Sequence, residues 1–332
     1  MQGKNLPSGR RLRYNFLMKK SVLITGAAGF IGSHLSERFL AEGFDVLGVD
    51  NFLTGREANI QDALKNPSFR FEKADVIERF DFKNPFGGKF WMVLHFACPA
   101  SPTDFENLSQ EILEVDSIGT MNALKFAHEQ GAKFFIASTS EVYGDPLVHP
   151  QTEEYWGNVS STGPRSCYDE AKRFSEAATM VYHRKYKLDT RIVRIFNTYG
   201  PRMRLNDGRV VPALCEQALR GKPLTVHGDG TQTRSFCYVS DLVDGIFKLA
   251  MSKENLPTNV GNPVEYSLND FANVVNKLTG QKLATQYLPS RPEDPRRRKP
   301  DISKAKRILG WEPKVSLEDG LKLTLDAFKK EL

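Results

Sequence analysis

The sequence is poor in cysteine and has no long apolar run. Its 332 residues include four cysteines, no two of which stand in a CxxC pair: Cys98, Cys167, Cys215 and Cys237. Such scattered cysteines argue against a disulfide framework or a metal knuckle and are typical of a reducing compartment. No stretch approaches the roughly 18 apolar residues of a membrane span, and the first residues lack the apolar segment of a signal peptide. We expect a soluble, cytoplasmic protein with no metal site and no membrane partner.

The excess of basic charge is confined to one end of the chain. The formal net charge is +6, and residues 1–20 alone hold six lysines and arginines and no acid. The rest of the chain therefore carries no net charge, which argues against a nucleic-acid-binding domain. Because the first apolar run begins after Met18, residues 1–18 are predicted to be a flexible basic leader.

Short apolar runs alternate with longer amphipathic segments from residue 19 to residue 200. The runs are continuously apolar, as expected for strands that are buried on both faces. This alternation predicts an α/β fold, a doubly wound, Rossmann-like parallel sheet with helices on both faces. Residues 201–332 are predicted to form mainly a smaller C-terminal α/β cap that binds substrate, with later strands joining the sheet. The expected strands are 21–26, 45–50, 69–75, 91–97, 133–139 and 190–196, and the expected helices include 30–42, 107–130 and 166–187.

A glycine-rich segment, TGAAGFIGSHL at 25–35, follows the first expected strand. Glycines in a strand-to-helix turn let a pyrophosphate approach the backbone and the helix N-terminus. Asp50 ends the next strand, at about the distance expected for the acid that binds the adenosine ribose, and a carboxylate there favours NAD over NADP. The alternative is that Asp50 is an ordinary turn or capping residue. The predicted NAD-binding residues are Gly26, Gly29, Phe30, Ile31, Gly32, Asp50, Asn51, Phe52, Thr54, Gly55, Asp75, Val76, Ala97, Tyr168, Lys172 and Thr198.

Tyr168 and Lys172 lie four residues apart in a helical pattern, and therefore on one face. A lysine cation favours the phenolate and lowers the tyrosine pKa, so Tyr168 is predicted to be a base near neutral pH. A YxxxK pattern occurs about once by chance in such a sequence, and its position in a nucleotide-binding fold gives it weight. Thr139, at the end of the strand 133–139, is expected to hydrogen-bond a substrate alcohol.

These motifs resemble those of the extended short-chain dehydrogenase/reductases that act on nucleotide sugars, over about residues 20–330. Within that group the sequence is most similar to the UDP-glucuronate decarboxylases. The matching segments are ACPASP (97–102), STSEVYGDP (138–146), GPRSCYDEAKR (163–173), RIFNTYGPRM (194–203), NDGRVV (206–211), GNPVEYS (261–267) and DPRRRKPDI (294–302).

The resemblance implies a role for each matching residue. Tyr168 would deprotonate the sugar 4-hydroxyl while NAD⁺ takes the hydride, and Glu141 and Arg298 would assist decarboxylation. The implied substrate-binding residues are Ser140, Asn197, Arg204, Arg209 and Arg234. Judged without the family, Glu141 could be a turn carboxylate, and the arginines could be surface charges. The resemblance also implies a homodimer formed by the two long helices.

One segment departs from the decarboxylase pattern. Where those enzymes carry Lys-Thr-Asn, with the lysine associated with the sugar acid, this chain has Glu114-Val115-Asp116. The charge reversal at Glu114 leaves two alternatives open. One is a different NAD-dependent conversion, by a nucleotide-sugar 4-epimerase or 4,6-dehydratase. The other is a catalytically silent NAD-binding protein.

Overall fold

The computed structural model describes residues 19–290 and 297–332. The predicted leader, residues 1–18, lies outside the described residues. No helix within the described ranges is long and apolar enough to cross a membrane. In the same ranges no group of histidine, cysteine, aspartate and glutamate side chains is placed to hold a metal ion. The four cysteines are free thiols.

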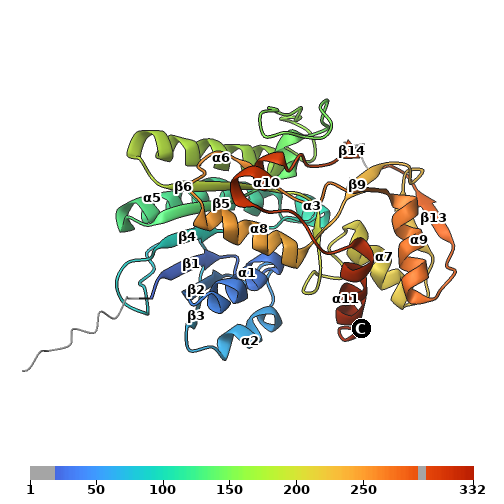
Figure 1. The fold of residues 1–332 in the computed structure, drawn as a ribbon, viewed down its shortest axis with the longest axis horizontal. Coiled ribbons are helices and arrows are strands. Elements are labelled where there is room, and N and C mark those ends of the chain that lie inside the picture. The colour runs from blue at the N-terminus through green and yellow to red at the C-terminus, as the bar shows by residue number, and fades with distance from the viewer. Residues whose placement is uncertain (1–18, 291–296) are drawn as a thin grey trace, which may run out of the picture.

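A parallel sheet forms the centre of the molecule (Figure 1). In the described part of the chain it has seven strands in the order β11-β6-β5-β4-β1-β2-β3. Leu23 pairs with Leu47 on one side and with Val93 on the other, so apolar side chains lie in register across the sheet. The strands are β1 (Ser21–Thr25), β2 (Asp45–Asp50), β3 (Phe69–Lys73), β4 (Met92–His95), β5 (Lys133–Thr139), β6 (Thr190–Ile195) and β11 (Thr258–Val260). The predicted doubly wound fold is confirmed.

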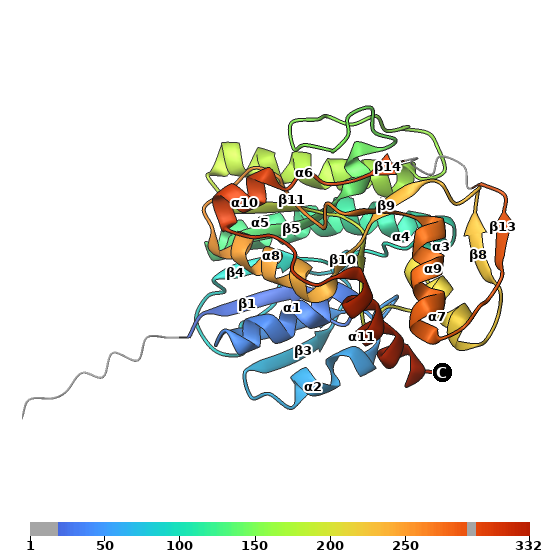
Figure 2. The same cartoon turned by 45° about the vertical axis from the view of Figure 1, so that its right-hand side comes forward.

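Helices cover both faces of this sheet. Helices α5 and α6 lie on one face, and α1 and α8 lie on the other (Figures 1 and 2). The bounds are α1 (Phe30–Ala41), α2 (Gln61–Leu64), α3 (Pro102–Asn107), α4 (Ser109–Glu114), α5 (Thr120–Gln130), α6 (Ser166–Tyr186) and α8 (Val239–Met251), with 3₁₀ turns η1 (Glu57–Ile60) and η3 (Ser140–Tyr143). The helix expected over 107–130 is divided, because the π-helical turn η2 (Val115–Gly119) separates α4 from α5.

The C-terminal part builds a smaller lobe beside the sheet, with α7, α9, β8 and β13 at its outer end (Figure 2). Its elements pair as β8 with β13, β7 with β10, and β12-β9-β14. The strands are β7 (Thr198–Tyr199), β8 (Leu224–His227), β9 (Thr233–Ser235), β10 (Cys237–Tyr238), β12 (Glu265–Ser267), β13 (Thr285–Leu288) and β14 (Arg297–Arg298). The helices are α7 (Val210–Leu219), α9 (Leu268–Thr279), α10 (Ser303–Leu309) and α11 (Leu317–Lys329). Most of these strands are too short for apolar periodicity to reveal them.

Serine caps begin two of these helices. The Ser267 hydroxyl accepts a hydrogen bond from the Asp270 N–H at 3.0 Å, and the Ser316 hydroxyl accepts one from the Asp319 N–H at 3.1 Å. Each cap satisfies one of the amide groups that the first helical turn leaves without a partner. Local sequence therefore determines where α9 and α11 start.

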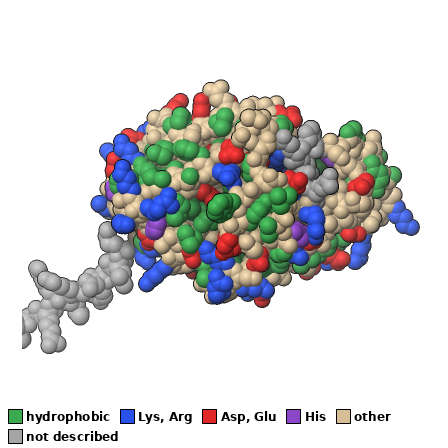
Figure 3. Space-filling view, turned by 90° about the horizontal axis from the view of Figure 1, so that it is seen from above, with side chains coloured by type: hydrophobic (Ala, Val, Ile, Leu, Met, Phe, Trp, Pro, Cys, Tyr) green, Lys and Arg blue, Asp and Glu red, His purple; other side chains and the backbone are tan. Residues whose placement is uncertain are grey.

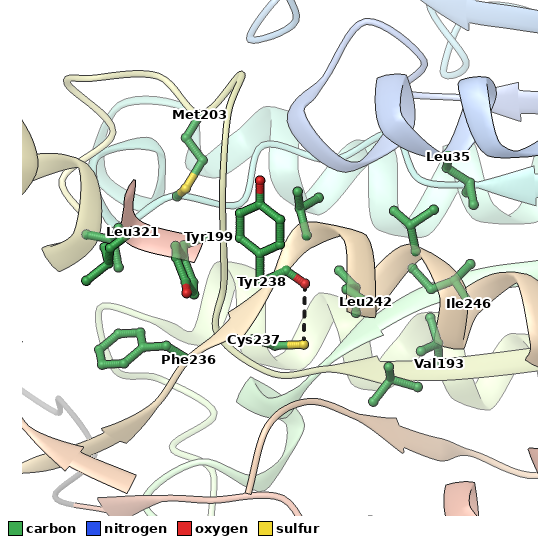
Figure 4. Packing of buried hydrophobic residues seen from close by; sticks show 14 of the residues in the cluster. Leu35, Val193, Tyr199, Met203, Phe236, Cys237, Tyr238, Leu242, Ile246 and Leu321 are labelled. Atoms are coloured by element: carbon green, nitrogen blue, oxygen red, sulfur yellow. Dashed lines mark hydrogen bonds between the residues drawn. The ribbon is translucent and has the colours of Figure 1, made fainter. Parts of the chain in front are cut away.

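The hydrophobic core is continuous between the sheet and the smaller lobe. Leu35 of α1, Val193 of β6 and Ile246 of α8 belong to the same buried cluster as Phe236 and Leu321 of the lobe (Figure 4). The lobe therefore shares its core with the sheet. The division at residue 200 remains a prediction about domain organisation.

Candidate active site

A cleft of about 400 Å³ lies between the carboxyl ends of the central strands and the smaller lobe. Ligands of open parallel sheets bind at this edge. Among the described residues, seven lysine and arginine side chains line the cleft against three aspartate and glutamate side chains: Arg165, Lys172, Arg202, Arg204, Arg209, Arg234 and Arg298 against Asp104, Glu141 and Asp207. This balance favours an anionic ligand.

The glycine-rich turn is packed too tightly for a side chain at Gly26 or Gly32. Gly26 has φ +70°, and a Cβ atom there would lie 2.7 Å from the carbonyl carbon of Phe96. A Cβ on Gly32 would lie 2.0 Å from the Gly26 carbonyl oxygen. Gly29 precedes α1, and no side chain caps that helix. The N–H groups of its first turn are therefore available to an anion, and the turn fits the pyrophosphate of a dinucleotide.

Asp50, at the end of β2, is held by hydrogen bonds from the glycine-rich turn and from its own loop. Its Oδ2 accepts a hydrogen bond from the Ala28 N–H at 3.0 Å, and its Oδ1 accepts one from the Phe52 N–H at 2.8 Å. Burial raises the pKa of this carboxyl, and the backbone hydrogen bonds oppose the shift. A Cβ on Gly55 would lie 2.8 Å from Oδ1, so glycine is required there.

The predicted site residues fall into two groups. The larger group lines the cleft: Gly26, Gly29, Phe30, Ile31, Gly32, Thr54, Thr139, Ser140, Glu141, Tyr168, Lys172, Asn197, Thr198, Arg204, Arg209, Arg234 and Arg298. The others are not among the residues that line the cleft: Asp50, Asn51, Phe52, Gly55, Asp75, Val76 and Ala97. Within that second group, Asn51 Nδ2 donates to Asp75 Oδ2 at 2.8 Å and joins the ends of β2 and β3.

Tyr168 lies on the first turns of α6, beside the end of β5. The Phe105 ring stacks on its ring at a centroid distance of 4.8 Å, and the Thr139 side chain acts on the phenol to lower its pKa. Lys172 Nζ lies 5.7 Å from the centre of the tyrosine ring and donates to the Ala137 carbonyl at 3.1 Å. The structure thus brings the predicted hydroxyl, phenol and ammonium groups together.

The net pKa shift of Tyr168 differs from the expectation. Burial raises the pKa of this phenol; Lys172 acts in the predicted direction and lowers it, while Cys98 and Asp116 raise it further. The expected net lowering of the Tyr168 pKa is therefore wrong for the chain without ligands. Sequence spacing revealed the lysine but not the desolvation or the nearby carboxylate.

Glu141 lies between two arginines. Arg298 approaches it through Nη1 and through Nη2, the latter at 2.7 Å from Oε2, and Arg165 Nη2 lies 2.5 Å from Oε2. Burial raises the pKa of Glu141, but the two guanidinium groups outweigh it and hold the pKa at about 2. Glu141 is therefore ionised at neutral pH and accepts hydrogen bonds from both arginines. The two guanidinium groups line this side of the cleft.

The remaining predicted arginines belong to the lobe side of the cleft. Arg234 and Arg298 are register partners on the parallel strands β9 and β14, and both are buried. Arg204 Nη2 donates to Asp104 Oδ2 at 2.6 Å, and Arg209 Nη2 donates to the Ala100 carbonyl at 3.0 Å. Arg204 and Arg209 therefore tie the lobe to the segment that follows β4.

Several residues that line the cleft are absent from the predicted set, among them Arg165, Arg202 and Asp104. Arg165 could have been found, because it stands three residues before Tyr168 on the same helical face. Asp116 was noted only as a departure from a pattern, yet it pairs with Lys172 at 2.8 Å. Glu114, expected near a sugar carboxylate, does not line the cleft and accepts a hydrogen bond from Gln110 at 2.8 Å. The expectation that Glu114 faces the substrate is therefore wrong.

Comparison with known proteins agrees with this geometry. The family model of GDP-mannose 4,6 dehydratase matches residues 23–324. UDP-glucuronic acid decarboxylase 4 of Arabidopsis thaliana is 48% identical over 311 residues, which cover 94% of this chain and 69% of that protein. UDP-glucuronic acid decarboxylase 1 of Xenopus tropicalis is 48% identical over 314 residues, covering 95% and 73%.

A solved structure has the same architecture. The UDP-glucuronic acid 4-epimerase of Bacillus cereus, in complex with UDP-glucuronic acid and NAD, superposes with a TM-score of 0.84 at 32% identity, covering 94% of this chain and 100% of that one. The fold, the glycine-rich turn and the Tyr168–Lys172 pair define a nucleotide-sugar enzyme of the extended short-chain dehydrogenase/reductase class. Within that class the chain belongs to the GDP-mannose 4,6-dehydratase family, and it is similar to the UDP-glucuronic acid decarboxylases.

Proposed function

We propose that this chain is an NAD-dependent UDP-glucuronate decarboxylase, a carboxy-lyase that forms UDP-xylose through a 4-keto intermediate. The observation that carries the proposal is the cluster of Glu141, Arg165 and Arg298 beside Tyr168, in the cleft of a chain 48% identical to named decarboxylases. In this proposal the cationic donors of the cluster would meet the sugar carboxylate next to Tyr168, the group that removes the proton of the sugar 4-hydroxyl.

The glycine-rich turn, Asp50 and Lys172 would hold the cofactor. NAD⁺, when bound, would accept a hydride from the sugar and return it at the end of the cycle. Gly26 and Gly32 keep this turn tight, because a Cβ atom at either position would clash with the backbone. The tight turn would let the pyrophosphate approach the start of α1. Lys172 lines the cleft and provides an ammonium group for the nicotinamide ribose.

Tyr168 is the proton carrier of the proposed reaction. Its phenolate takes the proton of the sugar 4-hydroxyl as the hydride leaves C4, and Thr139 orients that hydroxyl. The resulting 4-ketone makes the sugar a β-keto acid. The bond from C5 to the carboxylate then breaks, CO₂ leaves, and the electron pair moves to the 4-oxygen as an enolate, which the Tyr168 hydroxyl stabilises as a donor.

Two further steps complete the balance of the reaction. C5 takes up a proton, and C4 takes back the hydride while Tyr168 returns the proton to the 4-oxygen. The net change is the exchange of CO₂ for one proton on the sugar. Arg298 and Arg165 would position the carboxylate before it leaves, and Glu141 holds the two guanidinium groups in place. Orientation of the breaking bond is their main contribution.

The lobe would recognise the nucleotide part of the substrate. Arg234 is buried at the cleft, where a guanidinium can bind a diphosphate by charge-assisted hydrogen bonds. Ser140, Asn197, Arg204 and Arg209 also line the cleft and are assigned to the sugar and phosphates.

A homodimer belongs to the same proposal. Helices α4 to α6 expose Leu113, Ile118, Met121, Phe174 and Val181, each at 40% or more. On α6 the residues at 174 and 181 are seven apart and share a face. Hydrophobic side chains gather among charged ones on the molecular face seen in Figure 3. A second copy that pairs these helices would cover the exposed apolar residues. The cytoplasmic location stays a prediction.

The activity can be tested directly with the purified chain. Incubation with UDP-glucuronate and NAD⁺ should release CO₂ and form UDP-xylose in equal amounts. Formation of UDP-galacturonate without CO₂ would replace the proposal with a 4-epimerase. No turnover of UDP-glucuronate, together with conversion of a UDP- or dTDP-hexose to its 4-keto-6-deoxy product, would indicate a 4,6-dehydratase. No turnover of any of these sugars would indicate a silent NAD-binding protein.

A further inference from the structure

Asp116 is a buried acid in direct contact with the lysine of the site. Its side chain is 0% exposed, and its Oδ1 accepts a hydrogen bond from Lys172 Nζ at 2.8 Å. It belongs to the π-helical turn η2, whereas Lys172 belongs to α6. A π-turn adds a residue to a helix and is frequent at functional sites. The ion pair therefore joins the two helices, and its Lys172 Nζ lies 5.7 Å from the centre of the Tyr168 ring.

The surroundings of Asp116 hold it in one place. The Cys98 thiol lies 3.1 Å from Oδ2, and the Ser175 hydroxyl donates to the Asp116 backbone carbonyl at 2.7 Å. Both carboxylate oxygens are thus occupied by donors. A carboxylate in this setting is fixed to within a narrow range of positions, and it fixes Lys172 in turn.

The other titratable groups around Lys172 are neutral or are the reacting groups themselves. His95, on β4, is buried, and burial together with the nearby Lys172 charge lowers its pKa to about 3, so it carries no charge at neutral pH. Burial and the Asp116 carboxylate raise the pKa of the Cys98 thiol. Tyr168 completes the set. Burial raises the pKa of Asp116 and the Lys172 ammonium opposes that shift. The 2.8 Å contact between the two side chains is that of an ion pair.

We propose that Asp116 is a positioning residue that holds Lys172 for the cofactor and, through its negative charge, sets the pH above which Tyr168 acts as a base. A lysine ammonium has three donors. Asp116 Oδ1 and the Ala137 carbonyl take two of them, at 2.8 and 3.1 Å. Lys172 also lines the cleft, so its ammonium group lies within reach of a ligand bound there.

The effect of Asp116 on Tyr168 follows from the negative charge of its carboxylate. A carboxylate near a phenol disfavours the phenolate, whereas the ammonium favours it. The two act in these opposite directions on the Tyr168 pKa. Removal of the Asp116 charge leaves the full effect of Lys172, so the Tyr168 phenolate forms at lower pH.

Asp116→Asn separates charge from contact. Asparagine keeps an acceptor oxygen for Lys172 and loses the negative charge, and it is the residue that the decarboxylase pattern has at this position. We expect the acid limb of the pH profile of kcat/KM to move about one unit toward lower pH. The NAD affinity of the ligand-free chain, measured by calorimetry, should stay within about threefold of wild type, because the acceptor is retained.

Asp116→Leu tests the contact itself. Leucine branches at the same carbon as aspartate, although it is larger, and it offers no acceptor, so Lys172 loses its anchor. We expect the NAD dissociation constant to rise by about tenfold or more. Glu114→Gln is the matched control, since Glu114 lies two residues away, outside the cleft, and this change also removes one negative charge. It should leave both the pH profile and the NAD affinity unchanged.

This inference rests on the Tyr168–Lys172 chemistry of the proposed function, but it does not depend on the product formed. Reduction of bound NAD⁺ by any oxidisable nucleotide sugar gives the pH profile, and calorimetry needs no turnover. If the acid limb of the kcat/KM profile does not shift in Asp116→Asn, the Asp116 charge does not set the pH at which Tyr168 acts as a base. An equal shift in Glu114→Gln would overturn that role as well. Wild-type NAD affinity in folded Asp116→Leu would overturn the anchoring role. Failure of CO₂ release with these shifts intact would count against the substrate alone.

Discussion

At the scale of single residues, the cleft is built from buried charges that neutralise one another. Glu141 lies between Arg165 and Arg298, and Asp116 pairs with Lys172. Removing one member of a buried pair leaves the other charge without compensation, which costs more than the pair contributes. Such pairs therefore maintain the geometry of the site before a ligand arrives.

Tyr168→Phe is expected to remove the proton carrier while leaving the fold intact. The phenol ring stacks on Phe105, and phenylalanine keeps that contact. We expect kcat to fall by about 10²- to 10⁴-fold, with NAD affinity close to wild type. Tyr182→Phe makes the same change on α6 away from the cleft lining and should have no effect on kcat. Full activity in the Tyr168 variant would contradict the mechanism whichever nucleotide sugar is used.

Glu141→Gln is expected to destabilise the protein in a pH-dependent way. The folded-state pKa of Glu141 is about 2, below its ordinary value of 4.5, so its contribution is complete above pH 4.5 and is lost as the pH falls toward 2. At pH 7 we expect the variant to lose about 3 kcal/mol of unfolding free energy.

Urea denaturation at pH 7, 5 and 3.5 measures this difference. The difference in unfolding free energy between wild type and Glu141→Gln should be constant from pH 7 to pH 5 and should become smaller at pH 3.5. Glu170→Gln removes a surface pair with Arg173 and serves as the control, with an expected loss below about 1 kcal/mol. A gap that widens at acid pH would show that Glu141 is not held as a carboxylate.

At the scale of elements, the sequence predicts those strands, turns and helices whose positions depend on a local pattern of residues. The strand β1, the glycine turn and α1 follow from a continuous apolar run and a glycine-rich segment, so their positions could be read directly. The Glu141–Arg298 pair joins residues 157 positions apart, and no local pattern reports such a contact. The π-turn η2 was missed for a related reason, because its sequence VDSIG is compatible with an ordinary helix.

Gly32→Ala is expected to damage the cofactor turn through a single methyl group. A Cβ atom there would lie 2.0 Å from the Gly26 carbonyl oxygen, so the turn and α1 must separate. We expect NAD affinity, measured by calorimetry, to fall by about tenfold or more, since a displaced turn no longer fits the pyrophosphate. Gly43→Ala is the control: its φ of +83° makes alanine costly for stability, but a Cβ there meets nothing within 4 Å, so NAD affinity should be kept. Unchanged affinity in Gly32→Ala would remove the turn from the cofactor site.

At the scale of the whole molecule, a shared core makes the cleft a rigid feature rather than a gap between independent parts. Leu35, Val193 and Leu321 belong to one buried cluster, although they lie in α1, in β6 and in the C-terminal helix α11 (Figure 4). The residues on the two sides of the cleft are therefore fixed relative to one another by apolar packing. Composition predicted a buried core but could not predict that it would cross the expected boundary at residue 200.

The exposed apolar residues of α4 to α6 lead to the last prediction, which concerns assembly. Leu113 of α4, Ile118 of the π-turn and Val181 of α6 are each 47% exposed. A stable homodimer needs roughly 800 Å² of buried surface on each partner, and two pairs of long helices can provide it. Sedimentation analysis should give twice the chain mass for wild type.

Val181→Glu should shift this equilibrium to monomer, because a dimer interface would bury the new charge opposite its own copy. Leu256→Glu is the matched control: Leu256 is 55% exposed and lies before β11 rather than on these helices, so the variant should remain dimeric. Folding of both variants is checked by circular dichroism. A wild-type monomer, or a Val181→Glu dimer as stable as wild type, would place the contact elsewhere or exclude it. Because α6 also carries Tyr168 and Lys172, a dimer formed through this helix would stiffen the element that positions both reacting groups, and the monomeric variant is therefore expected to bind NAD more weakly than Leu256→Glu.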